Sequence, residues 1–191
     1  MKRWIPYVLI FLSLEMSACA GGESETAVVQ KDETIATVTP TAYPTPYPEM
    51  PRPDSCPITQ RPEPRFIPPE PYAEWAPGGG FWYGTNELWI DLHSGGTWHG
   101  LPKSDAGYVN KIALWSESYS QTMEQQPEIT LSARHLDSKA VIEPHIHGTN
   151  AYHPDYGHFM MTGIELPTLG CWEISAEYKE TTLSFVVWVA P

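Results

Sequence analysis

The chain from Phe81 to Val189 alternates between short runs rich in β-branched and aromatic residues and shorter runs of glycine, proline and polar residues. No segment has a sustained helical period, and no internal repeat is present. Regularly spaced short strands of this kind predict an all-β fold, an antiparallel β-sandwich. The predicted strands are 81–83 with 87–92, 111–116, 128–134, 159–165, 171–178 and 181–189.

The last two runs predict the clearest hairpin. Alternate apolar residues share one face of each strand: Trp172, Ile174, Ala176 and Tyr178, then Leu183, Phe185, Val187 and Val189. Val186 and Trp188 make the opposite face of the second strand apolar too, and Cys171 points away from the face of Trp172. We therefore expect another segment of the chain to cover this outer face.

The segment before the domain is rich in proline, with 13 of the chain's 20 prolines between Pro40 and Pro77. Residues 21–39 are small, polar and acidic, a composition that cannot bury enough apolar surface to order itself. A proline-rich chain favours an extended, semi-rigid spacer. We predict a disordered acidic and Pro-rich tether over residues 19–55. Apolar side chains after Cys56 predict an arm over 56–77 that packs on a β-sandwich domain over 78–191.

The first 18 residues have the features of a signal peptide: Lys2 and Arg3, then an apolar run over 4–14 that is too short to span a bilayer. The sequence Met16-Ser17-Ala18-Cys19 resembles the lipobox of bacterial lipoproteins. This resemblance implies cleavage before Cys19 and acylation of its thiol with fatty acids such as palmitate. The protein would then be anchored by lipid to the extracytoplasmic face of the cell membrane. The alternative is an ordinary signal peptide that leaves a soluble secreted protein.

The chain has three cysteines, an awkward number for an exported protein unless one has another role. If Cys19 carries lipid, Cys56 and Cys171 remain as a pair, and the compartment outside the cytoplasm permits a disulfide bond. This bond would close a loop of 115 residues and tie the arm to the outer face of the last hairpin. Two separate thiols are the alternative.

The segment 170–174, followed by 185–189, is similar to the closing hairpin of immunoglobulin-like domains in bacterial surface proteins. Over 56–191 the layout resembles a group of uncharacterised bacterial lipoproteins with a Cys-Pro pair near the start of the domain. The resemblance implies an immunoglobulin-like architecture and carries no activity. Leu169 stands two residues before Cys171, so the tyrosine corner of antibody domains is missing.

The net charge of the chain and its lack of known catalytic motifs argue against several classes of function. The formal net charge of −12 argues against nucleic-acid binding and against a basic patch for anionic lipids. We find no catalytic motif, neither a Gly-x-Ser-x-Gly elbow nor a phosphate-binding loop. The segment Asp91-Leu92-His93-Ser94 is interpreted as a strand that runs into a Gly95-Gly96 turn, because triads are assembled in space and rarely from neighbours on one strand. The sequence does not predict an enzyme.

Four of the seven histidines lie close together in the sequence: His145, His147, His153 and His158. His145 and His147 would project from one face of an extended segment, and neutral imidazoles there suit Zn²⁺ or Cu²⁺. A third ligand would come from His153, Asp155 or His158. Asn150 and Gly157 instead favour an exposed loop whose histidines hold no metal.

Six aromatic residues cluster early in the domain: Trp75, Phe81, Trp82, Tyr83, Trp89 and Trp98. We expect most of them in the core, while exposed rings could form a platform for sugars. The sequence therefore predicts a lipid-anchored extracytoplasmic binding or structural module of unknown activity, with a protein or glycan as its ligand. The alternatives are a metal-binding protein and a carbohydrate-binding module.

Overall fold

The computed structural model describes residues 51–191. The predicted signal peptide, Cys19 and the chain up to Met50 lie outside the described residues. Within 51–191 a short 3-10 helix precedes ten strands. The helix is η1 (Pro77–Gly79), and the strands are β1 (Phe81–Thr85), β2 (Leu88–Leu92), β3 (Thr97–Trp98), β4 (Tyr108–Leu114), β5 (Ile129–His135), β6 (Val141–Ile146), β7 (Thr149–His153), β8 (Gly157–Leu166), β9 (Gly170–Tyr178) and β10 (Thr181–Val189).

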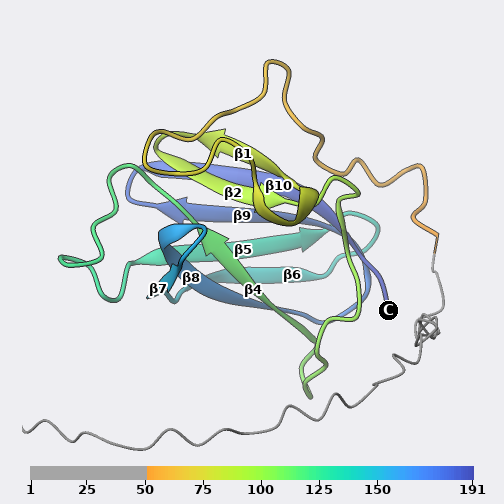
Figure 1. The fold of residues 1–191 in the computed structure, drawn as a ribbon. Coiled ribbons are helices and arrows are strands. Elements are labelled where there is room, and N and C mark those ends of the chain that lie inside the picture. The colour runs from red at the N-terminus through yellow and green to blue at the C-terminus, as the bar shows by residue number, and fades with distance from the viewer. Residues whose placement is uncertain (1–50) are drawn as a thin grey trace, which may run out of the picture. The chain divides into compact units, whose positions relative to one another are not determined.

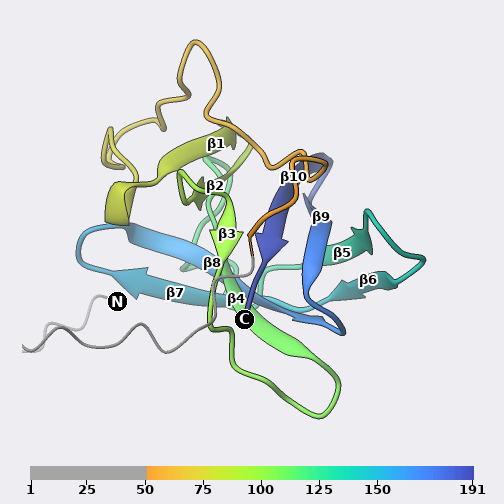
Figure 2. The ribbon, with the colours of Figure 1, turned by 90° about the vertical axis from the view of Figure 1, so that its right-hand side faces the viewer.

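The strands form two main sheets that face each other across one core. The five-stranded sheet has the order β3-β10-β9-β5-β6, and the three-stranded sheet has the order β4-β8-β7. The β1–β2 hairpin lies at one end of both, as Figures 1 and 2 show. The main core contains side chains from both sheets and from the hairpin. The predicted all-β sandwich is confirmed.

The last hairpin is built as its alternation predicts. Residues 181–189 pair antiparallel with 170–178, and all eight apolar residues of the predicted inner faces are buried in the main core. One pairing differs from the expected antiparallel pattern, because β3 runs parallel to the end of β10. This two-residue strand follows the Gly95-Gly96 turn and carries the chain from the hairpin to the edge of the larger sheet. It is too short to leave an alternation signal in the sequence.

The histidine segment is not the exposed loop that we expected. It forms β6, at the edge of the five-stranded sheet, and β7, at the edge of the three-stranded sheet. The loop prediction was wrong because Asn150 lies within β7, and Gly157 marks only the turn between β7 and β8. The strands themselves are polar and mostly half-exposed or exposed, so neither has the apolar alternation that identifies a strand.

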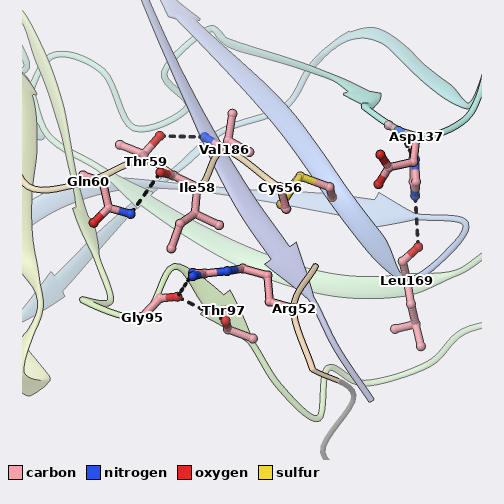
Figure 3. The surroundings of a disulfide bond; sticks show 12 residues. Arg52, Cys56, Ile58, Thr59, Gln60, Gly95, Thr97, Asp137, Leu169 and Val186 are labelled. Atoms are coloured by element: carbon pink, nitrogen blue, oxygen red, sulfur yellow. Dashed lines mark hydrogen bonds between the residues drawn. A yellow bond between two sulfur atoms is a disulfide. The ribbon is translucent and has the colours of Figure 1, made fainter. Parts of the chain in front are cut away.

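The arm covers the outer face of the last hairpin, and the Cys56–Cys171 disulfide holds it there (Figure 3). Cys56 and Ile58 are buried with Cys171 and Trp188 in a second apolar cluster. The backbone N–H of Thr59 donates to the Val186 carbonyl at 3.0 Å, and its hydroxyl accepts from the Val186 N–H at 2.8 Å. The predicted disulfide is confirmed, and its apolar surroundings explain why both faces of β10 are apolar.

The later part of the arm lies against the β1–β2 hairpin (Figure 1). Phe66 and Tyr72 contact the buried Trp89, with ring centroids 6.1 and 5.3 Å from it. The Trp82 indole N–H donates to the Ala73 carbonyl at 2.9 Å. The arm therefore completes a third apolar cluster, which is built around the buried Trp82, Trp89 and Trp115.

Across 51–191, no helix has the length and apolarity that a membrane crossing requires.

Candidate binding site

The four candidate metal ligands are divided between two sheets. His145 lies on β6 of the five-stranded sheet, whereas His153 and His158 lie on β7 and β8 of the other sheet. His147 follows the end of β6, where its backbone N–H donates to the Ile129 carbonyl at 3.0 Å. The chain crosses from one sheet to the other directly after this histidine.

The histidine side chains make separate contacts. The His145 Nε2 lies 3.3 Å from the Gly163 carbonyl. Gly163 is five residues from His158 along β8, so these two residues are about 16 Å apart. The His153 ring stacks on Tyr156, with centroids 4.2 Å apart. Within 51–191 no three histidine, cysteine or acidic side chains gather as a metal site would require. The structure gives the predicted Zn²⁺ or Cu²⁺ site no support.

The aromatic cluster belongs mainly to the core, as expected. Phe81, Trp82 and Trp89 are buried, and Tyr83 and Trp98 are half-buried. Trp75 is the exception, because 63% of its surface is exposed on the arm. The Arg65 guanidinium covers its ring, 3.9 Å from the centroid. Among the tryptophans of residues 51–191, Trp75 is therefore exposed and Trp98 half-buried, while the others are buried, and these two lie on different parts of the described domain.

Trp98 lies beside a hollow that we call the β2–β4 hollow. The backbones of Trp89 and Trp115 exchange two hydrogen bonds, of 2.9 and 3.0 Å, and so join the start of β2 to the end of β4. Beyond this bridge the two strands are not paired, and residues from Thr97 to Leu101 line the space beside them. The result is a hollow of about 250 Å³.

The hollow has an apolar floor and a polar rim. Ile90 and Ile112 are buried at its base. Around them are polar side chains of several kinds, one carboxylate, one ammonium, two imidazoles, one amide and one hydroxyl: Asp91, Lys111, His93, His99, Asn110 and Thr97. A few convergent polar groups around an apolar base are typical of a small-ligand site.

Asp91 is a half-buried carboxyl group at the rim of the hollow. Burial raises the pKa of its carboxyl group, and this effect exceeds the lowering caused by its own backbone N–H and by His93. A half-buried carboxylate whose desolvation exceeds the stabilisation by its neighbours destabilises the fold when it is ionised. Such groups occur more often at functional sites than elsewhere on a protein surface.

The sequence does not predict the hollow. Its pattern indicates only that Asp91 and His93 lie in a strand that runs into a turn, and nothing in it distinguishes Lys111 or Asn110 as site residues. Alternation along β2 does place Asp91 and His93 on one face, opposite Ile90. Their meeting with β4 depends on where the two strands diverge, which no local pattern encodes.

Comparison with known proteins finds no family model, no curated protein and no solved structure that matches this chain.

Proposed function

We propose that the protein is an exported, lipid-anchored binding module that acts at the extracytoplasmic face of a bacterial membrane. The Cys56–Cys171 disulfide is the observation that carries this proposal. Disulfides form and persist outside the cytoplasm and are rare within it. The bond uses two of the three cysteines and leaves Cys19, in its lipobox-like sequence, for acylation.

The fold supports a binding role. The arm is held along the domain by the disulfide, by Thr59 and by contacts to Trp89, so the domain presents a fixed surface. On that surface the β2–β4 hollow offers hydrogen-bond donors and acceptors above an apolar floor. Lipid on Cys19 would hold this hollow at the membrane through the proline-rich segment.

Metabolic labelling tests the proposal. The full chain is expressed in a bacterium with an alkyne analogue of palmitate, and the cells are separated into cytoplasmic, membrane and exported soluble fractions. We expect the labelled protein in the membrane fraction, cleaved before Cys19. A Cys19→Ala variant should carry no label, while a Cys56→Ala variant of the same chain should be labelled normally.

Two results would contradict the proposal. Label that persists in the Cys19→Ala protein would place acylation elsewhere. An unlabelled wild-type protein in the exported soluble fraction would identify an ordinary signal peptide instead of a lipobox.

A further inference from the structure

Backbone groups of two strands face the β2–β4 hollow. Trp89 and Trp115 direct their peptide groups toward each other, and the ladder alternates with a period of two residues. The peptide groups of Asp91 on β2, and of Ala113 and Lys111 on β4, are therefore directed into the gap. In the described chain, 51–191, no backbone hydrogen bond joins Asp91 to Ala113. The Asp91 N–H interacts with its own carboxyl group, which leaves the Asp91 carbonyl and the Ala113 peptide groups directed into the gap.

The charges around the hollow balance. Asp91 supplies one negative charge and Lys111 one positive charge, although the whole chain has a formal net charge of −12. A site for a phosphate or a divalent cation would have an excess of one sign. The Asn110 amide both donates and accepts hydrogen bonds, a carboxylate accepts and an ammonium donates. This mixture matches neutral hydroxyl groups, each of which donates and accepts.

The remaining lining suits the less polar face of a sugar ring. Trp98 is half-buried and packs edge-on against Phe185, with ring centroids 6.4 Å apart. Ile90 and Ile112 supply apolar surface to the same hollow. Sites for drug-sized ligands have volumes of about 300–1,000 Å³. A hollow of about 250 Å³ is therefore suited to one ring of a larger molecule whose remainder lies outside.

We infer that the β2–β4 hollow binds one ring of a neutral carbohydrate, with Asp91 and Lys111 hydrogen-bonded to its hydroxyl groups and Trp98 against its C–H face. The inference names the ligand class of the proposed binding module and so rests on that proposal. It accounts for Asp91, a carboxylate that the fold retains at a cost to its stability. Trp75, the exposed tryptophan of the arm, has no part in the inferred site.

The test measures binding of the full-length chain, in mild detergent, to defined probes by isothermal titration calorimetry. Four neutral probes are hexaoses of β-glucose, α-glucose, xylose and N-acetylglucosamine; heparin and trialanine are the charged and zwitterionic probes. We expect at least one neutral hexaose to bind. Asp91→Asn and Trp98→Ala should each weaken it by about tenfold or more, since each removes a direct contact.

Matched variants separate this site from other surfaces. Asp105→Asn changes an exposed carboxylate outside the hollow, and Trp75→Ala removes the exposed arm tryptophan, so neither should change the affinity. Asp91→Asn keeps the size and shape of the side chain. If Trp98→Ala unfolds, as judged by its melting temperature, the Asp91→Asn result alone decides the test.

Several results would overturn the inference. Failure of all four neutral hexaoses to bind would do so, and so would binding that Trp75→Ala abolishes and Asp91→Asn leaves unchanged. Binding of heparin or trialanine that depends on Asp91 would leave a binding module with a different ligand class. Loss of the Cys19 label would remove the proposed lipid anchor whatever the sugars show, so the two failures are distinguishable.

Discussion

Breaking the Cys56–Cys171 bond should destabilise the protein by several kcal/mol. The bond closes a loop with a sequence separation of 115 residues. The chain-entropy relation for a loop of that size gives about 16 cal/mol/K, or about 5 kcal/mol at 25 °C. We expect a measured loss of roughly 2–5 kcal/mol, because engineered and native disulfides often contribute less than this relation gives.

The assay is urea unfolding of the full-length chain in mild detergent, followed by tryptophan fluorescence, with and without a thiol reductant. The reduced protein keeps the Ile58 packing and both hydrogen bonds between Thr59 and Val186, so its loss of stability reports the cross-link. The Cys56→Ala/Cys171→Ala variant is the control, and reductant should leave its midpoint unchanged. An unchanged midpoint for the wild-type protein on full reduction would refute the reasoning.

Three further predictions concern single side chains. Gly96→Ala should lower the free energy of unfolding in urea by about 1–3 kcal/mol, because φ is +59° there and a Cβ would lie 2.6 Å from Ile58 of the arm. Gly95→Ala is the control and should leave the stability unchanged, because a Cβ there would have no atom within 4 Å. Asp91→Asn should raise the stability at pH 7 and abolish a loss of stability that the wild type shows as pH rises above about 3.8. The sign follows because burial raises the folded-state pKa of Asp91, so the folded protein binds more protons in that window; an unchanged difference between the two proteins from pH 3 to 7 would contradict it. Tyr178→Phe should cost about 1 kcal/mol at neutral pH, since its hydroxyl donates to Glu124 at 2.7 Å. Burial and Glu124 raise the pKa of Tyr178 above its usual 10, so the wild type should lose stability above pH 10 more steeply than the variant, and parallel alkaline titrations would argue against this contact.

The sequence predicted the parts of the fold where alternation is strong. β9 and β10 each place four apolar residues on one face, and both strands form as expected. The apolar outer face, with Val186 and Trp188, also indicated that a further segment covers it. The cysteine count then identified Cys56 as the tie, because the lipobox-like sequence accounted for the third cysteine.

The sequence did not predict the edge strands β3, β6 and β7. β6 has only Ile142 and His145 half-buried, and Val141 and Ile146 are exposed. Such a strand is held by its backbone bonds to β5 and not by an apolar face, so its residues carry no clear signal. The distance between His145 and His158 depends on the crossing of the chain from one sheet to the other. The sequence spacing of the two histidines does not reveal this crossing.

The candidate site was the least predictable feature. The β2–β4 hollow exists because two strands are joined at Trp89 and Trp115 and part beyond them. Asp91 and Lys111 are twenty residues apart in the sequence and belong to different sheets. Alternation within one strand does not predict which residues of another strand lie beside it.

The intact mass of the protein purified from bacterial membranes tests the account most directly. We expect a chain that begins at Cys19, carries the added mass of its acyl groups and is two hydrogens lighter than the fully reduced form. Reduction and alkylation should then modify two cysteines, Cys56 and Cys171, and no third. A chain without acyl groups, or one whose Cys56 and Cys171 react with alkylating agent before reduction, would contradict it.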